Sequence, residues 1–418
     1  MKVIHLSSSD KGGGAARVTV DISNALYKAG TNSAVLVQQK FSSDNHVHSA
    51  TKTIIQKIYF FFRFWFDYLV ICFFTKRTHG RFSFPFWGID ITKESLIREA
   101  DIIHLHWINQ GFFSIKTFQK LIELNKPIVW TLHDMWGFTG GCHYSGRCEK
   151  FISECRNCPS LIFSSGNDLS NKIFNDKIYI YKNLNINIVT CSKWLANEAK
   201  RSFLFQNKKI TTIPNPINTD IYKPVDKKIA REELGLPEDK ILILFGTMNL
   251  KEIRKGFVYL KKALKIIIED NPALKEKIEL FVFGASNSKD LDDINFKANF
   301  LGRISDTQKL IYCYNAADVF VAPSLEDNLP NTVMESLSCG TPVVAFNIGG
   351  MPDMIEHKIN GYLAKPGNQD SLAEGIMWVI QNQSKKKTLS FNARKKVIEN
   401  FTPERIASLY INFYNSLV

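Results

Sequence analysis

Residues 323–350 read PSLEDNLPNTVMESLSCGTPVVAFNIGG and follow an apolar run that begins at Asp318. An acidic loop comes first, then a short helix, then a second apolar run at 342–346 and a Gly-Gly turn. Asn328 is expected as the N-cap of the helix, and Gly340 as the residue that ends it. Strands and helices that alternate in this way predict an α/β domain with a parallel sheet.

The loop and the helix of this stretch carry three carboxylates that suit a sugar nucleotide. Glu335 can accept two hydrogen bonds from a vicinal diol such as a ribose, and Glu326 and Asp327 can do the same for the hydroxyls of a sugar. The free N–H groups of the first helical turn favour a phosphate. The alternative is an ordinary surface loop and helix, and the residues alone leave both interpretations open.

Outward from this stretch, strands and helices alternate along the chain in two series. Strands are expected at 1–8, 32–39, 101–107, 127–134 and 186–192, and then at 241–247, 278–285, 318–324 and 342–346. Helices are expected at 256–270, 370–382 and 403–418. A proline-rich connection at 210–224 separates the two series. We therefore expect two doubly wound α/β domains that face a central cleft, with ligands at the carboxyl ends of the strands.

Length and composition agree with two domains. A chain of 418 residues is too long for one ordinary core, and 45% hydrophobic with 22% charged residues is a globular composition. The formal charge of +13 suggests an anionic partner, which can be a nucleotide, a phospholipid headgroup or a nucleic acid. The first residues lack the pattern of a secretory signal, so a cytoplasmic location is expected. In that compartment the eight cysteines are more often free thiols or metal ligands than disulfides.

A glycine run, Gly12-Gly13-Gly14, lies between the first strand and the first helix. Glycines there let a ligand approach the backbone and the helix N-terminal amides. The run is not GxGxxG, and the second strand ends in Gln38-Gln39 rather than an acidic residue, so it does not predict a dinucleotide site. A glycine loop that faces the cleft is the preferred interpretation.

Histidines end two of the expected strands. His104 and His106 close the strand at 101–107, and His133 with Asp134 closes the next. An open α/β sheet presents its site residues at these positions, and a neutral imidazole there can donate a hydrogen bond or relay a proton. Purely structural histidines are the alternative.

Four cysteines lie within 17 residues at Cys142, Cys148, Cys155 and Cys158. Four thiolates can close a tetrahedral structural zinc site, although only the last pair has the close spacing of a zinc knuckle. Free thiols and disulfides are the alternatives.

Segment 54–75, IIQKIYFFFRFWFDYLVICFFT, contains ten aromatic residues and has basic residues on either side. Gln56, Arg63 and Asp67 share one face of the expected helix, which leaves a broad apolar surface. Two charged residues in the middle disfavour a membrane span. An interfacial helix on an anionic membrane is the preferred interpretation, and a buried core helix is the alternative.

Two cations, Arg254 and Lys255, lie between a strand and a helix in GTMNLKEIRKGF at 246–257. Cations at the carboxyl end of a strand can neutralise a pyrophosphate. Solvated charges at the start of a helix are an equal alternative for this segment alone.

Together these motifs resemble the retaining glycosyltransferases of family 4, which have the two-domain GT-B fold. The resemblance is strongest over 241–365, where Pro323 places the acidic positions of the family motif at Asp327 and Glu335. The family usually has Glu at the first of these positions, whereas this chain has Asp327 preceded by Glu326. WTLHD at 130–134 resembles the segment whose histidine meets the donor sugar, which is His133 here.

The resemblance implies a role for each remaining motif. His133, Asp327 and Glu326 are the implied catalytic residues, Gly12, Gly13 and Gly14 form the implied acceptor-side loop, and Lys255, Arg254, Arg303, Asn328, Leu329, Pro330, Asn331 and Glu335 are the implied donor-binding residues. Residues 1–222 become the acceptor-side domain and 223–400 the donor domain, and a helix at 401–418 crosses back to the first domain. No catalytic metal is implied.

The function expected from the resemblance is transfer of a sugar from a nucleotide-diphosphate sugar to a glycan hydroxyl. If segment 54–75 docks on the inner face of the plasma membrane, a polyprenyl-diphosphate-linked glycan is the expected acceptor, in surface polysaccharide synthesis. A GT-B-shaped sugar-nucleotide epimerase is one alternative. A zinc-ribbon module that binds nucleic acid is another, but it predicts aromatic residues interleaved with cations, whereas here the aromatics gather in one segment.

Overall fold

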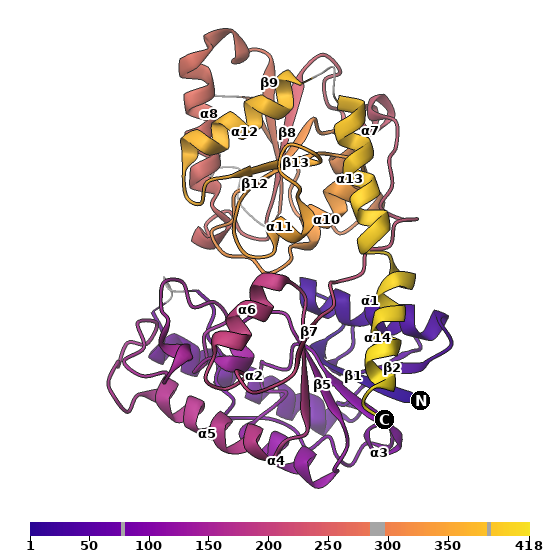
Figure 1. Cartoon of the computed structure of the whole chain (residues 1–418), viewed down its shortest axis with the longest axis vertical. Helices are drawn as coiled ribbons and strands as arrows, with labels where there is room; N and C mark the ends of the chain where they lie inside the picture. The colour runs from indigo at the N-terminus through magenta and orange to yellow at the C-terminus, as the bar shows by residue number, and fades with distance from the viewer. Residues whose placement is uncertain (77–79, 285–296, 383–385) are drawn as a thin grey trace. The chain divides into compact units, whose positions relative to one another are not determined.

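The computed structural model describes residues 1–76, 80–284, 297–382 and 386–418 (Figure 1). The chain forms two compact units, which we call unit 1 (Met1–Pro216 with Pro403–Val418) and unit 2 (Ile217–Thr402). The boundaries expected at 222 and 400 lie a few residues from these divisions. The last residue of the strand expected at 278–285 lies outside the described residues.

Unit 1 is built on a seven-stranded sheet in the order β3-β2-β1-β4-β5-β6-β7, in which all neighbouring strands are parallel. Its strands are β1 (Lys2–Ser9), β2 (Asn32–Gln39), β3 (Val47–Ser49), β4 (Ile102–Leu105), β5 (Ile128–Leu132), β6 (Ile186–Thr190) and β7 (Ile210–Thr212). Its helices are α1 (Gly14–Lys28), α2 (Ile54–Phe74), α3 (Ser95–Glu99), α4 (Ile115–Glu123), α5 (Leu169–Asn183), α6 (Lys193–Arg201) and α14 (Pro403–Asn415).

The two faces of this sheet are covered by different layers because successive strand residues point to opposite faces. Leu6 and Leu105 belong to one core cluster, whereas Val3 and Ile102 belong to another that includes Tyr410 of α14. In Figure 1, α14 lies beside α1 in the same unit. The C-terminal helix thus completes the core of unit 1.

Unit 2 is built on a six-stranded parallel sheet in the order β10-β9-β8-β11-β12-β13. Its strands are β8 (Ile241–Gly246), β9 (Ile278–Phe283), β10 (Lys297–Phe300), β11 (Val319–Ala322), β12 (Val343–Phe346) and β13 (Gly361–Ala364). Its helices are α7 (Lys227–Leu234), α8 (Phe257–Asp270), α9 (Thr307–Ala316), α10 (Asn331–Ser338), α11 (Met351–Met354), α12 (Gln369–Gln381) and α13 (Lys386–Asn400). Two parallel-sheet α/β units confirm the predicted fold class.

The helix predicted after the acidic loop, α10, begins later than expected. Its N-cap is Pro330, which makes no side-chain capping bond, so the prediction of Asn328 as the N-cap is wrong. Gly340 follows the helix with φ of 78°, in the left-handed region that the predicted stop requires. The extra loop residues between Asn328 and Asn331 therefore lie in the strand-to-helix connection, beside the acidic pair.

Helix α2 is the least buried long helix of unit 1. Asp67 is its one buried residue, and side chains such as Ile54, Tyr59 and Phe61 are more than half exposed. The interpretation of this segment as a buried core helix is therefore wrong. Among the described residues, no helix is both long enough and apolar enough to cross a membrane.

Candidate functional site

The acidic loop of unit 2 is joined by an ion pair to the cations that follow β8. Lys255 Nζ lies 2.6 Å from Asp327 Oδ2, and an Arg254 terminal nitrogen lies 3.5 Å from the same oxygen. Arg254 also donates to the backbone carbonyl of Glu326 at 2.7 Å. The two segments that the sequence placed 72 residues apart thus meet at the carboxyl edge of the sheet, where β8 and β11 are neighbours.

Two glycines permit this close packing of loops. A Cβ on Gly256 would lie 1.8 Å from the carbonyl oxygen of Pro323, and one on Gly349 would lie 1.8 Å from that of Asp327. Both glycines also have positive φ, of 70° and 52°. Any side chain at either position would push the loops of Lys255 and Asp327 apart.

Asp327 carries the carboxylate that pairs with both cations. Asp327 is buried, and burial by itself would raise its pKa, but the charges of Lys255 and Arg254 lower that pKa below its ordinary value. The carboxylate is therefore ionised at neutral pH. Glu326 is half-buried and joins the cluster through its backbone.

Glu335 lies on the first turns of α10 and is 3% exposed. Its Oε2 accepts a hydrogen bond of 2.7 Å from the hydroxyl of Tyr314 in α9. Sequence reasoning missed Tyr314, because nothing in its local pattern marks it as a partner of a residue two elements away. The hydroxyl orients the carboxylate without neutralising it.

The other predicted donor residues lie around the same edge of unit 2. Arg303 is exposed in the loop after β10, Asn328 and Leu329 are buried, and Pro330 and Asn331 are half-buried at the start of α10. Arg303 follows the outermost strand of the sheet, whereas α10 follows a central one.

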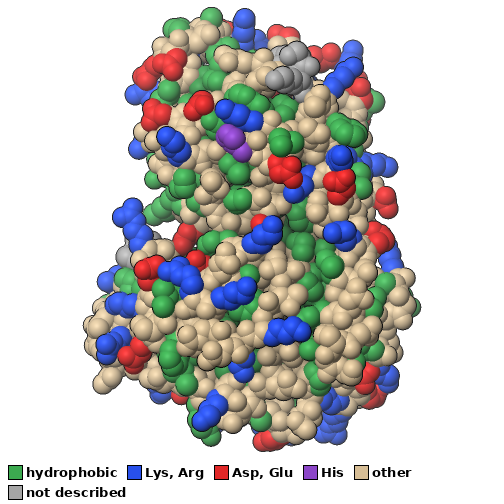
Figure 2. All heavy atoms as spheres, viewed as in Figure 1, with side chains coloured by type: hydrophobic (Ala, Val, Ile, Leu, Met, Phe, Trp, Pro, Cys, Tyr) green, Lys and Arg blue, Asp and Glu red, His purple; other side chains and the backbone are tan. Residues whose placement is uncertain are grey.

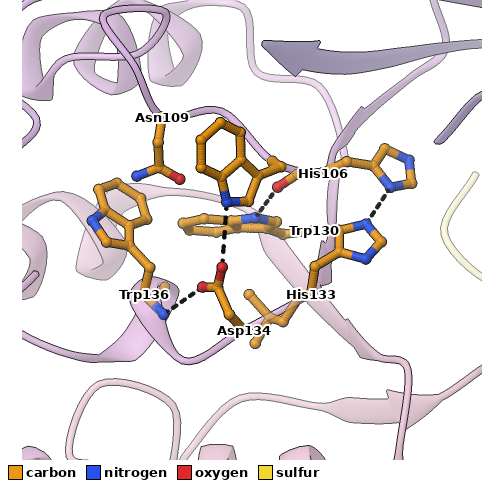
Figure 3. A pocket seen from close by; sticks show the side chains of 9 residues that line it. His106, Asn109, Trp130, His133, Asp134 and Trp136 are labelled. Carbon is orange, nitrogen blue, oxygen red and sulfur yellow. Dashed lines mark hydrogen bonds between the residues drawn. The ribbon is translucent and has the colours of Figure 1, made fainter. Parts of the chain in front are cut away.

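In unit 1, His133 and Asp134 line a narrow pocket after β5 (Figure 3). Three tryptophans share the lining: Trp107, Trp130 and Trp136. Asp134 accepts hydrogen bonds from His143 Nδ1 at 2.7 Å and from the indole N–H of Trp107 at 3.3 Å. Burial would raise the pKa of Asp134, but His143 lowers it below the ordinary value. Sequence reasoning missed His143, because it lies in the cysteine loop, where only the thiols were considered as functional groups.

His104 in β4 and His106 directly after it differ in their surroundings. His106 lines the pocket, and its Nδ1 lies 3.2 Å from Nε2 of His133. His104 is fully buried beneath α14, where Tyr414 Oη lies 2.6 Å from its Nδ1 and Thr131 Oγ1 lies 2.7 Å from its Nε2. The structural interpretation therefore fits His104, and His106 belongs with His133.

The glycine loop of unit 1 is open. Gly12, Gly13 and Gly14 are exposed, and a Cβ on Gly12 or Gly13 would meet no atom of the described residues within 4 Å. Gly13 is the N-cap of α1 and has no side chain to cap its N–H groups. The loop therefore has space and donors for an oxygen-rich ligand.

The four cysteines of the 142–158 loop are all free thiols in the structure. Cys155 Sγ accepts a hydrogen bond from the backbone N–H of Gly140 at 3.2 Å. In the described part of the chain, the group of three metal-binding atoms within 4.8 Å of one another is His5, His104 and His106. The thiols thus lie further apart than a zinc site requires.

Comparison with known proteins assigns the chain to a family. Residues 12–221 match the profile of glycosyltransferase family 4, and residues 226–396 match that of the glycosyl transferases of group 1. The chain belongs to glycosyltransferase family 4. It is thus an enzyme, a glycosyltransferase, and the recognition made from the motifs is confirmed.

Two relatives match most of the chain. An uncharacterized glycosyltransferase of Methanocaldococcus jannaschii is 27% identical over 346 residues, 78% of this chain and 85% of that one. The putative colanic acid biosynthesis glycosyl transferase WcaC of Escherichia coli is 24% identical over 365 residues, 82% of each chain.

Solved structures share the fold at lower identity. The sucrose-phosphate synthase of Thermosynechococcus elongatus has a TM-score of 0.68 at 19% identity and covers 100% of this chain and 99% of its own. Anabaena HepE in complex with UDP has a TM-score of 0.66 at 17% identity, and each chain is covered completely. The GT-B fold of the family 4 glycosyltransferase is thereby confirmed.

Structural zinc in the cysteine loop stays our proposal. Zinc would draw the four thiols together, and we expect about one equivalent of zinc in protein purified without added metal. Cys148→Ser is expected to lower that value, and Cys72→Ser, outside the loop, is expected to leave it unchanged. Less than about half an equivalent by elemental mass spectrometry would contradict the proposal.

Proposed function

We propose that this family 4 glycosyltransferase transfers a sugar, with retention of configuration, from a nucleoside-diphosphate sugar to a hydroxyl of a lipid-linked glycan. The observation that carries the proposal is the Lys255–Asp327–Arg254 cluster beside the N-terminus of α10. It combines cations for a diphosphate with a buried, ionised carboxylate for sugar hydroxyls. The structures of Anabaena HepE in complex with UDP and with UDP-glucose support a nucleotide sugar as the donor.

The proposed chemistry needs charge stabilisation at the leaving group. The bond between the anomeric carbon and the phosphate oxygen breaks, the acceptor oxygen bonds to the same face of that carbon, and the acceptor proton goes to the departing phosphate. Lys255, Arg254 and the first N–H groups of α10 would stabilise the charge that develops on the diphosphate. These groups supply the role for which other transferases use a divalent metal.

Asp327 and Glu335 would hold the two sugars of the donor. Glu335 accepts hydrogen bonds from the ribose diol, with Tyr314 holding its orientation. Asp327 binds a hydroxyl of the transferred sugar, and His133 in unit 1 takes the donor-sugar role that the family resemblance implies. Gly12 to Gly14 form the acceptor-side loop.

Nucleotide binding is tested first by thermal shift. A ligand that binds the native state raises the melting temperature, so one of UDP, GDP or ADP, or its sugar conjugate, is expected to do so. Glu335→Gln keeps the contact with Tyr314 but loses a charged hydrogen-bond acceptor, and we expect affinity to fall about tenfold or more. The exposed Glu233→Gln is the matched control. No shift with any of these nucleotides would contradict the donor site.

Transfer itself is tested at the acidic pair. Asp327→Asn keeps the volume but removes the charge that orients Lys255, so kcat/KM is expected to fall on the order of a hundredfold. Glu326→Gln retains the backbone carbonyl that Arg254 binds, and a change of less than about threefold is expected. Both are measured by release of free nucleotide with acceptor present, after melting curves establish that the variants fold. A larger loss in Glu326→Gln would reverse the assignment.

The proposal of a lipid-linked acceptor is based on the exposed apolar surface of α2. Its exposed large apolar side chains are Ile54, Ile55, Ile58, Tyr59, Phe61, Phe62, Phe64, Trp65, Phe66, Tyr68 and Phe73. The exposed charged residues between 52 and 76 are Lys52, Lys57 and Lys76, because Arg63 is half-buried and Asp67 is buried. An aromatic helix with cations and no exposed acid matches the interface of an anionic membrane.

The rest of the basic residues do not form a second such surface on the face seen in Figure 2. Lysine and arginine side chains there are scattered over both units and interspersed with acidic ones. On this face, the distribution does not form the continuous basic stripe that nucleic-acid binding favours.

Membrane docking is tested by co-sedimentation with vesicles. We expect binding to vesicles that contain phosphatidylglycerol and weaker binding to phosphatidylcholine alone. Replacing Phe61, Phe64 and Trp65 by Ser is expected to reduce binding about tenfold for each aromatic side chain removed from the interface. Phe391→Ser, which removes an exposed aromatic of unit 2, is the control. Equal sedimentation of the triple variant and the unaltered chain would exclude this surface.

A further inference from the structure

We propose that His5 and His106 are positioning residues that hold His133 as a neutral imidazole with its hydrogen on Nδ1. The inference deepens the proposed function, because it assigns a hydrogen-bonding role to the histidine placed at the donor sugar. It depends on a row of three imidazoles, those of the buried His5 and His106 and the half-buried His133, that the reaction scheme above does not explain.

The three histidines lie on neighbouring parallel strands. His5 is on β1, His106 directly follows β4 and His133 directly follows β5, in a sheet whose order is β1-β4-β5. Nδ1 of His5 lies 2.9 Å from Nε2 of His106, and Nδ1 of His106 lies 3.2 Å from Nε2 of His133. Figure 3 shows the second of these hydrogen bonds at the rim of the pocket.

Each of these imidazoles carries a single hydrogen. Burial lowers the pKa of His5 to about 3 and that of His133 to about 4, and the pKa of His106 lies well below its ordinary value for the same reason. A neutral imidazole donates from one nitrogen and accepts at the other. Fixing the hydrogen of one ring therefore fixes the hydrogens of the other two.

Cys191 determines which nitrogen of His133 carries the hydrogen, and thus the donor-to-acceptor direction of the hydrogen bonds along the row. Its thiol donates to the carbonyl oxygen of Leu132 at 3.4 Å, and its sulfur lies 3.7 Å from Nδ1 of His133. Burial raises the pKa of Cys191, so the thiol keeps its one hydrogen, which the carbonyl already accepts. The sulfur is then an acceptor towards His133, which places the hydrogen of His133 on Nδ1.

The other two rings follow from that assignment. Nε2 of His133 accepts from Nδ1–H of His106, and Nε2 of His106 accepts from Nδ1–H of His5. All three rings thus take the same tautomer.

His5, at the other end of the row, independently favours the same donor-to-acceptor direction of the hydrogen bonds. Nε2 of His5 is buried and has no hydrogen-bond partner among the described residues. In the assigned direction this atom is a bare lone pair, whereas the reverse direction would bury an unpaired N–H. An orphaned buried N–H is the rarer and costlier of the two.

A metal ion is the competing explanation for these histidines. The ligand atoms of His5, His104 and His106 lie within 4.8 Å of one another. However, the hydroxyls of Tyr414 and Thr131 lie at hydrogen-bond distance from the two nitrogens of His104. A metal would have to displace one of these hydroxyls and break the bond between His5 and His106. We therefore favour the hydrogen-bonded row.

The row gives His133 a defined chemical role. His133 is half-buried, and its Nδ1–H is a hydrogen-bond donor with a fixed direction. A sugar hydroxyl oxygen is a better acceptor for it than the thiol sulfur 3.7 Å away. With its pKa near 4, the ring orients the donor sugar at neutral pH and does not act as a general acid. Without the row, the ring could exchange its hydrogen to Nε2 and turn a lone pair towards the substrate.

The tautomer can be read directly by long-range 15N–1H NMR of the full chain labelled with 15N-histidine. We expect the pattern of an Nδ1–H imidazole for His133, identified as the signal that is lost in His133→Asn. An Nε2–H pattern, which is the preferred form of free histidine, would overturn the proposal. So would a spectrum of His5 and His106 that changes on removal of metal by a chelator.

Variants of His106 separate positioning from packing. The amide nitrogen of Asn occupies the place of imidazole Nδ1, so His106→Asn is expected to preserve the Nδ1–H form of His133 and most of kcat. His106→Leu is expected to mix the tautomers and lower kcat about tenfold, with nucleotide affinity unchanged. Equal kcat values for these two variants would contradict a positioning role. If the His106→Leu variant does not fold, the NMR spectrum of the unaltered chain still decides the tautomer.

The two proposals fail separately. The NMR measurement needs no substrate, so a confirmed Nδ1–H tautomer together with full activity of His133→Ala would remove His133 from the proposed function and leave the row intact.

Discussion

The ion pair between Lys255 and Asp327 is the interaction on which the candidate site of unit 2 depends. It joins the segment after β8 to the segment after β11, and these two segments form the edge of the sheet where a ligand has access to helix N-termini. Gly256 and Gly349 let the backbones approach closely enough for the pair to form. Without it, the buried carboxylate would have to take up a proton or move into solvent.

Unit 1 depends on a different constraint, because one face of its sheet is covered by the C-terminal helix α14. Tyr410 and Tyr414 of α14 bring two hydroxyls to Thr131 and His104 in the buried face of the sheet. Polar groups in that position need partners, and the returning helix provides them. The same face carries the row of imidazoles, whose nitrogens lie at hydrogen-bond distance from one another, except that Nε2 of His5 has no partner among the described residues.

The strands that were predicted are short apolar runs bounded by turn residues, whereas the short strands β3, β7, β10 and β13 were not predicted. Helix α13 was not predicted, since its buried residues are isolated among lysines and polar residues: Leu389, Ala393 and Val397. The motif residues Asp327, Lys255 and Glu335 could be chosen in advance, whereas the link between His5 and His106 spans 101 residues and depends on strand order. Exposure of α2 was also beyond the sequence, because an aromatic helix suits a core and an interface equally.

The Asp at position 327 is one departure from the family pattern, and the geometry gives it a physical reason. Its short side chain reaches Lys255 Nζ at 2.6 Å while its own backbone carbonyl is held by the N–H of Gly350 at 3.3 Å. A Glu there would be one methylene longer, and the carboxylate would have to fold back or displace the lysine. The chain therefore holds the carboxylate close to the cations that would bind the diphosphate, where a longer side chain would extend further towards the sugar. In the proposed function, Asp327 thereby contributes both to leaving-group stabilisation and to sugar recognition.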